Sequence, residues 1–329
     1  MISRRMFPAR FAAAVAGLVL GISIACGGPA PEAPKPQPIT IATFSKALGN
    51  SPYYIARHFK WFEADPNLKD VAISYKEYND RPTISAAFDS GELQVLFSAD
   101  VPSILCRAQG NDIRIAAISA TVGQNILVRS DLPYKEVPDL KGKTLAIQQG
   151  TSSYYGLLKI LKTYKLEEKD LAIKYMPAAE AKAAFETNQI EAWAVWAPFV
   201  EQQEVSGKGR LVLGGDAMVN SVMSLSQRFI QEREAAARGV VAAVQRAKAW
   251  IQANPDEAQK IMAQELGLDP AVVKQAWPKH DWGVQLNDKL ISDIQDKATF
   301  LADEDKTRAS KKLDVRGELV DTRFLPSVK

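Results

Sequence analysis

The feature that most constrains the fold is an alternation, from Ile39 onward, of short apolar segments with segments of helical periodicity. Strands are predicted at 39–44, 71–78, 93–97, 113–118, 125–129, 144–148, 171–175, 191–195 and 210–213. Helices are predicted between them at 52–62, 83–90, 102–109, 152–164, 179–187 and 198–205. Alternation of this kind is typical of an α/β fold with mainly parallel strands.

The alternation stops near Ile118 and starts again at Asn125, so two α/β units are predicted. After about Ser226 the pattern is almost wholly helical, with helices predicted at 231–252, 255–265, 270–277 and 288–303. Two units followed by a helical tail predict two lobes, with the tail returning to the first lobe.

In each unit, a polar loop follows the first strand and leads into a tyrosine-containing helix. The first loop and helix start span 45–54, and the second pair spans 149–155. Ligands of parallel α/β sheets bind beyond the carboxyl ends of the strands, and a helix N-terminus there offers free N–H groups and a partial positive charge. Two such termini would hold a small anion. Ser and Asn are also the preferred N-cap residues, so ordinary capping explains the same pattern.

The N-terminus has the features of a bacterial export signal. Arg4, Arg5 and Arg10 precede an apolar segment, 11–25, which is too short to span a bilayer comfortably. Cys26 follows small residues, as in a bacterial lipobox, although Ser23 stands where Leu is usual. We therefore expect a signal peptide at 1–25 and a lipid on Cys26. The alternative is an ordinary secretory peptide with Cys26 incidental, and both alternatives predict export.

The segment 26–38, which begins at the predicted lipidation site, is Pro-rich and is expected to form an extended tether.

Composition argues against several classes of function. The net charge is +3, but the leader holds three arginines and no acid, and without them 38 basic residues face 38 acidic ones. A near-neutral body without basic runs does not predict nucleic-acid binding. The chain has two histidines and, besides Cys26, one cysteine, Cys106, which we expect to be buried. We predict no metal, no cofactor and no catalytic residues.

Several motifs are similar to those of a known family. They are Thr43-Phe44-Ser45, Tyr53-Tyr54-Ile55-Ala56, Gly91-Glu92-Leu93-Gln94-Val95, Asp139-Leu140-Lys141-Gly142-Lys143, Gly150-Thr151-Ser152-Ser153 and Glu191-Ala192-Trp193-Ala194-Val195-Trp196-Ala197-Pro198. Together they resemble the solute-binding proteins of ABC importers, of the nitrate, taurine and aliphatic-sulfonate type. The resemblance covers roughly 39–300, and Glu191 replaces the Asp that is usual in the last motif.

The resemblance implies a type II periplasmic-binding-protein fold. Two Rossmann-like lobes would be joined by two crossover strands, near 119–123 and 214–224, and the helical C-terminal tail would pack on lobe 1. Lobe 1 would comprise 39–120 and 221–329, and lobe 2 would comprise 121–220. A ligand would lie between the lobes.

By position, the resemblance also implies the ligand-binding residues. These are Ser45, Lys46, Asn50, Ser51 and Tyr53 on lobe 1, Arg81 and Asp100 near the cleft, and Thr151, Ser152, Ser153, Tyr154 and Trp196 on lobe 2. Arg81 could also be an exposed, solvated side chain. Trp193, Trp277 and Trp282 are expected to be core residues.

The implied function is capture of a small, anionic organic solute, such as a sulfonate or carboxylate, by a monomeric lipoprotein. Its partners would be an ABC permease and its ATPase, and the lipid on Cys26 would be its sole membrane contact. One alternative is a lipoprotein of the same fold that senses or presents a ligand. The other is an enzyme like the pyrimidine synthases of this fold, which use a cysteine-rich motif that this chain lacks.

Overall fold

The computed structural model describes residues 37–212, 217–304 and 312–324. The predicted signal peptide at 1–25, the lipidation site Cys26 and most of the tether at 26–38 lie outside these ranges. Among the described residues, no helix has the length and apolar character needed to cross a membrane.

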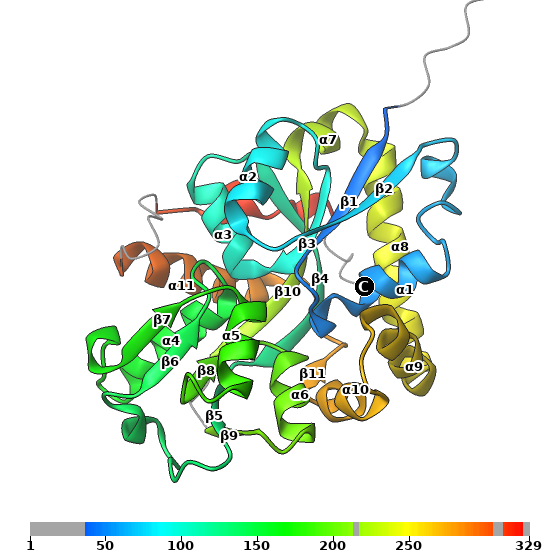
Figure 1. The fold of residues 1–329 in the computed structure, drawn as a ribbon. Coiled ribbons are helices and arrows are strands. Elements are labelled where there is room, and N and C mark those ends of the chain that lie inside the picture. The colour runs from blue at the N-terminus through cyan, green and yellow to red at the C-terminus, as the bar shows by residue number, and fades with distance from the viewer. Residues whose placement is uncertain (1–36, 213–216, 305–311, 325–329) are drawn as a thin grey trace, which may run out of the picture. The chain divides into compact units, whose positions relative to one another are not determined.

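The first sheet has the strand order β11-β4-β10-β3-β1-β2. Its strands are β1 (Ile39–Phe44), β2 (Ile73–Tyr78), β3 (Val95–Ala99), β4 (Ile113–Gly123), β10 (Met218–Ser226) and β11 (His280–Asp281). Helices cover both faces of this sheet (Figure 1), so its strands are apolar on both sides. Along β1, Ile39 and Ile41 pack on one side while Ala42 and Phe44 pack on the other, as the two-residue period of a strand requires.

Two groups of helices form these covering layers. On one face lie α1 (Ser51–His58), α7 (Gln227–Glu232), α8 (Glu234–Ala253) and α9 (Pro255–Leu266). On the other face lie α2 (Arg81–Asp89), α3 (Asp100–Ala108) and α11 (Asp288–Asp303). The helical tail therefore packs on the first lobe, as predicted. Cys106 is fully buried in this core, which raises the pKa of its thiol to about 12.

The second sheet has the order β7-β6-β8-β5-β9. Its strands are β5 (Ile126–Arg129), β6 (Thr144–Ile147), β7 (Ala172–Tyr175), β8 (Ala192–Ala194) and β9 (Gly209–Val212). Helix α4 (Ser152–Thr163) covers one face, and α5 (Ala178–Glu186) and α6 (Phe199–Val205) cover the other. Trp193 is buried in the core beneath α5 and α6, as expected.

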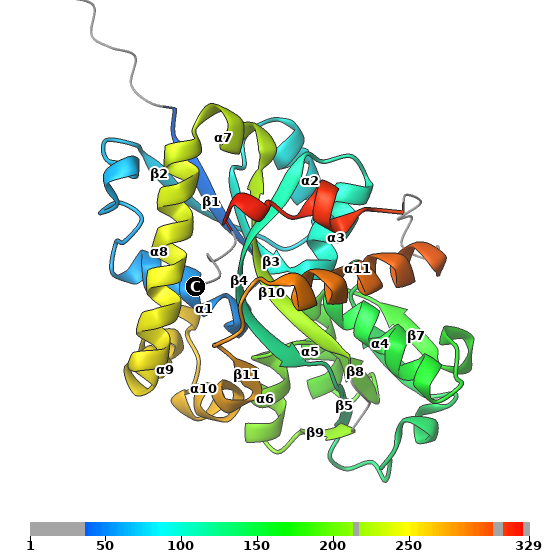
Figure 2. The same ribbon diagram turned by 180° about the vertical axis from the view of Figure 1, so that it is seen from behind.

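The prediction of mainly parallel strands is wrong. Strand β1 is parallel to β2 and β3, and β6 is parallel to β7 and β8. The pairings of β10 with β3 and β4, and of β5 with β8 and β9, are antiparallel. The reason is that β4 leaves the first lobe and β10 returns to it, so the two long strands run in opposite directions (Figures 1 and 2).

These two long strands are the predicted connections between the lobes. They pair from Gly123 opposite Met218 to Ile113 opposite Ser226. Residues 214–216 of the second predicted crossing lie outside the described ranges. The first sheet is built from strands within 39–123 and 218–281, and the second from strands within 126–212. The predicted lobe boundaries at 120/121 and 220/221 fall inside β4 and β10, and we retain them as a proposal.

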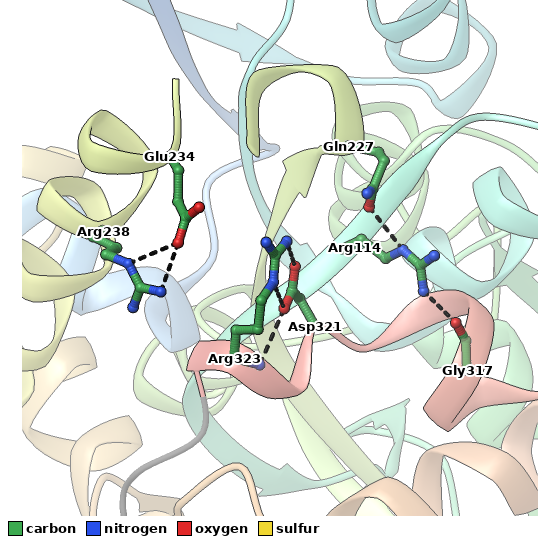
Figure 3. Close-up of polar contacts among 7 residues, drawn as sticks. All are labelled: Arg114, Gln227, Glu234, Arg238, Gly317, Asp321 and Arg323. Atoms are coloured by element: carbon green, nitrogen blue, oxygen red, sulfur yellow. Dashed lines mark hydrogen bonds and ion pairs between the residues drawn. The ribbon is translucent and has the colours of Figure 1, made fainter. Parts of the chain in front are cut away.

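The C-terminal segment 312–324 packs along the edge of the first sheet (Figure 3). Val320 forms a parallel bridge with Ile115, and the Asp321 N–H donates to the Ile115 carbonyl at 3.0 Å. Arg114 of β4 donates to the Gln227 side chain and to the Gly317 carbonyl. Together with β11, which pairs with the other end of β4, this segment covers the outer edge of that strand.

Gly156, inside α4, allows this helix to pack against the crossover. A side chain there would place its Cβ 2.2 Å from Cγ and 2.9 Å from Cβ of Gln124, which is buried. Gln124 directly follows β4, and its side-chain amide donates to the Val195 carbonyl at 3.0 Å. The Gln124 side chain therefore cannot move away without losing that hydrogen bond.

We expect Gly156→Ala to lower the free energy of unfolding by about 1–3 kcal/mol through overpacking, although the same change in an unconstrained helix gains about 1 kcal/mol. Urea unfolding followed by circular dichroism measures the difference. Gly123→Ala at the end of β4 is the control, because nothing lies within 4 Å of the Cβ that it would add and its φ is not in the positive range. A Gly156→Ala variant as stable as the original protein would contradict this account of the packing.

Candidate functional site

A cavity of about 550 Å³, counting its open mouth, lies where the two lobes and the crossover strands meet. Its walls come from the loops after β1, β3, β6 and β8, from β4 and β10, and from β11. The lining residues are Phe44, Ala47, Gly49, Asn50, Ala99, Pro102, Val122, Thr151, Ser152, Ser153, Trp196, Ala197, Val219, Ser221 and His280. The loops lie at the carboxyl ends of strands, where α/β ligands bind.

The N-terminus of α4 forms one wall of the cavity. Thr151 is the N-cap, with its side chain accepting from the Tyr154 N–H at 3.3 Å, and Ser152 and Ser153 begin the helix. The N–H groups of a first helical turn have no acceptor within the helix, and the helix dipole makes this end partly positive. The wall is therefore suited to a negatively charged or strongly polar group.

The hydroxyl groups at this terminus do not act as the expected donors to a ligand. Thr151 donates to the Gln148 carbonyl at 2.7 Å, Ser152 donates to Asp100 at 3.2 Å, and Ser153 donates to Gln124 Oε1 at 2.9 Å. Each hydroxyl proton is thus used within the protein. The backbone N–H groups remain as the donors that α4 can offer.

Asp100 is buried and does not line the cavity, so its predicted place in the cleft is corrected. Its carboxylate forms an ion pair with Lys297 of α11, and both side chains are almost fully buried. Asn220 of β10 donates to the same carboxylate at 2.8 Å. Because Ser152 belongs to the second lobe, this cluster joins the first lobe, the tail, a crossover strand and the second lobe.

The remaining walls are apolar, with two polar atoms that lack a partner. Phe44, Pro102, Val122, Val219 and Trp196 supply most of the apolar surface. Among the described residues, neither Trp196 Nε1 nor Asn50 Oδ1 has a hydrogen-bond partner, and both atoms are buried. A buried polar atom without a partner is costly, so a donor and an acceptor are available here for a ligand.

His280 contributes a further polar group that the sequence analysis missed. It is buried, stacks on Trp282, and its Nδ1 lies 2.9 Å from the Ala276 carbonyl oxygen. Burial lowers the pKa of His280 to about 4, so the ring is neutral at physiological pH. Trp277 and Trp282 are core residues, as expected.

The part of the cavity wall that the structure describes carries no formal charge. None of the described lining residues is Asp, Glu, Lys or Arg, and His280 is neutral. Within the described ranges, no three His, Cys, Asp or Glu side chains are grouped so that they could hold a metal ion. Any anion would therefore be held by dipoles and hydrogen bonds.

The cavity contains Asn50, Thr151, Ser152, Ser153 and Trp196 of the predicted set. The other predicted residues do not line the cavity. Tyr53 and Tyr154 are core residues, whose hydroxyls accept from Arg57 and donate to Glu168 respectively.

Four other predicted residues are also outside the cavity wall. Ser51 is buried and donates to the Leu48 carbonyl, and Ser45 and Lys46 lie in the loop before it. Arg81 pairs with Gln109 beside Gly150.

Beside the cavity, the tail contacts the second lobe through ion pairs. Lys279, which precedes β11, lies 2.9 Å from Glu201 and 2.9 Å from Glu204, both on α6. Gln275 of α10 (Pro270–Ala276) donates to Glu204 at 2.8 Å. The lobes are therefore joined at two places, one at α6 through Lys279 and Gln275, and the other at the Asp100 cluster.

Comparison with known proteins identifies the family. The family model described as NMT1/THI5 like matches residues 49–258. A putative aliphatic sulfonates-binding protein of Escherichia coli is 28% identical over 61% of this chain and 64% of its own length. A Bacillus subtilis protein of the same name is 25% identical over 84% of each chain. The aligned part of the chain thus spans just under two thirds of the Escherichia coli relative.

Solved structures share the fold. The alkanesulfonate-binding protein SsuA from Xanthomonas axonopodis pv. citri, bound to MOPS, is 24% identical, with a TM-score of 0.73 over 87% of this chain and 98% of that one. The desulfurization enzyme DSZB is also similar, at 15% identity and a TM-score of 0.64 over 87% of this chain and 97% of that one. The fold alone therefore does not separate binding proteins from enzymes. With two mixed sheets joined by long crossover strands and a family match over more than half of its length, the chain belongs to the NMT1/THI5-like family.

Proposed function

We propose that this protein captures a small organic sulfonate between its two lobes and delivers it to an ABC importer. The observation that carries the proposal is the cavity where the lobes meet, which has the N-terminus of α4 as one wall and apolar side chains around it. A sulfonate head suits the helix terminus, and a carbon chain suits Phe44, Val122 and Trp196. The names of the relatives, which are sulfonate-binding proteins, support the same ligand class.

Binding, rather than catalysis, is the activity that the cavity favours. Among the described residues, its lining holds no charged side chain, and the hydroxyl protons of Ser152 and Ser153 are donated to Asp100 and Gln124. A serine nucleophile needs a base that takes its proton, and neither Asp100, paired with Lys297, nor the neutral Gln124 amide is suited to that role.

Export and anchoring complete the proposal. The leader at 1–25 would direct secretion, acylated Cys26 would hold the protein at the membrane, and the Pro-rich segment would let the body reach its permease. The binding residues that we propose are Asn50 and Trp196, through their unpartnered atoms, and Ser152 and Ser153, through their backbone N–H groups.

The ligand class is tested by titration calorimetry on the full-length chain in a non-ionic detergent. Butane-1-sulfonate, pentanoate and butylammonium form a matched series in which the butyl chain is constant and only the head group changes. We expect the sulfonate to bind and the ammonium ion to show no heat of binding, because the helix terminus repels a cation. Binding of the ammonium ion, or of none of the three, would contradict the proposal.

A second prediction separates the backbone of α4 from its side chains. Proline is well tolerated at the first helical position, so Ser152→Pro removes one N–H group without breaking the helix. We expect it to weaken sulfonate binding about tenfold or more, as loss of a hydrogen bond to a charged group does. Ser152→Ala is the matched control and should stay within about threefold of the original affinity, because the Ser152 hydroxyl donates to Asp100. Equal affinities in the two variants would rule out the backbone N–H as a ligand contact.

The third prediction concerns pH. His280 has an ordinary pKa of 6.5 and a folded-state pKa of about 4, and the neighbouring charge of Lys279 acts in the same direction as burial. The unfolded chain therefore binds more protons between these values, so the free energy of unfolding falls as pH drops from about 7 to 4, by about 3 kcal/mol from this group. His280→Asn should reduce this fall, as measured by urea unfolding at each pH. An unchanged pH dependence in the variant would show that His280 is not buried in its neutral form.

A further inference from the structure

One corner of the cavity is rich in hydrogen-bond acceptors, and the proposed sulfonate head does not use it. Asn50, Ser221 and His280 meet there around Gly49. A Cβ at Gly49 would lie 2.1 Å from Ser221 Oγ and 4.0 Å from the His280 ring, so the three residues pack closely about this glycine. The corner comes from the first lobe and its tail, whereas the N-terminus of α4 belongs to the second lobe.

The orientation of the Asn50 amide follows from its neighbour. Its Nδ2 lies 3.5 Å from the Phe97 carbonyl oxygen, which can only accept a hydrogen bond. The nitrogen must therefore face Phe97, and Oδ1 is the atom left buried without a partner among the described residues. Asn50 is 1% exposed, so water in bulk does not satisfy this oxygen.

The tautomer of His280 follows in the same way. Nδ1 lies 2.9 Å from the Ala276 carbonyl oxygen and must carry the proton to make that bond. Because the neutral ring has one proton, Nε2 is an acceptor. The corner thus presents an amide oxygen that lacks a partner and an imidazole nitrogen that can accept a hydrogen bond from the ligand.

The lack of acidic side chains in the described cavity wall restricts which kind of donor group a ligand can place in this corner. Within the described ranges, no Asp or Glu lines the cavity, and the buried Asp100 behind it is already paired with Lys297. An ammonium group in the corner would be a buried cation without a counter-charge, which is unfavourable. An uncharged hydroxyl or N–H group satisfies the acceptors without this cost.

We propose that the cavity selects sulfonates whose other end carries an uncharged hydrogen-bond donor, received by Asn50 Oδ1 and His280 Nε2. This inference rests on the proposed function and names the substrate class within it. A donor-bearing ligand spans the cavity, with its anion at the N-terminus of α4 and its donor at the corner around Gly49.

The test uses three ligands of the same size on the full-length chain in a non-ionic detergent, by titration calorimetry. Propane-1-sulfonate, 2-hydroxyethanesulfonate and 2-aminoethanesulfonate differ by one terminal group: methyl, hydroxyl or ammonium. We expect the hydroxyl compound to bind at least about tenfold more tightly than the methyl compound, because the latter leaves the buried Asn50 Oδ1 unpaired. The ammonium compound should bind more weakly than the hydroxyl compound.

Two variants test whether Asn50 is the source of the preference for the hydroxyl compound over the methyl compound. Asn50→Leu keeps a side chain of similar shape and removes the acceptor, so the dissociation constant of the methyl compound divided by that of the hydroxyl compound should fall at least about threefold. Ser51→Ala is the matched control, because the hydroxyl of this buried neighbour is bound to the Leu48 carbonyl, and it should leave the ratio unchanged.

The outcomes distinguish this inference from the proposed function. Equal affinity for the methyl and hydroxyl compounds in the original protein would overturn the inference and leave sulfonate capture standing. Tightest binding of the ammonium compound would overturn the requirement for an uncharged donor. If none of the three binds at millimolar concentration, sulfonate capture itself fails, and the inference fails with it.

Discussion

The buried ion pair between Asp100 and Lys297 is the interaction on which the arrangement of the lobes depends. Asp100 begins α3 and Lys297 lies 197 residues later on α11, and the two side chains are 0% and 5% exposed. Removing one partner of such a pair costs about 3–5 kcal/mol, because the other charge is left buried. Asn220 and Ser152 complete the cluster, so the tail, the crossover and the second lobe are all fixed relative to the same carboxylate. Through Ser152, the cluster also contacts the N-terminus of α4, which forms one wall of the cavity.

Much of the fold could be predicted from local sequence pattern, because each element buries a periodic apolar face. Strand β1 and helix α11 have the bounds that the sequence predicted, and the other boundaries differ by a few residues. The helix expected to reach residue 62 ends at His58, since Lys60 has a positive φ of 55°. Strand direction could not be predicted in this way, because it depends on where a returning strand such as β10 pairs. The two-residue strand β11 is too short to show any period.

The site was predictable to the level of loops, and less so for individual side chains. Asn50, Thr151, Ser152, Ser153 and Trp196 line the cavity because loops at the carboxyl ends of strands converge there. Tyr53 and Tyr154 occupy the same helix starts, but their positions on the helix turn them into the core. The role of Asp100 depends on Lys297, a partner so distant in sequence that no local pattern reveals it. No sequence pattern predicted His280 as a site residue, because it lies in a short segment between helices and lines the cavity through tertiary packing alone.

The pairing of β4 with β10 has a consequence for the order in which the chain assembles. Gly123 and Met218 are opposite each other, although the whole second sheet is encoded between them. The first lobe therefore cannot complete its sheet until β10 and the short strand β11, which ends at Asp281, have been synthesised. The strands of the second lobe all lie within 126–212 and need no residue from outside that range to pair. Contacts between distant segments form slowly, so the contiguous second lobe can fold as a unit on which the discontinuous first lobe is then built.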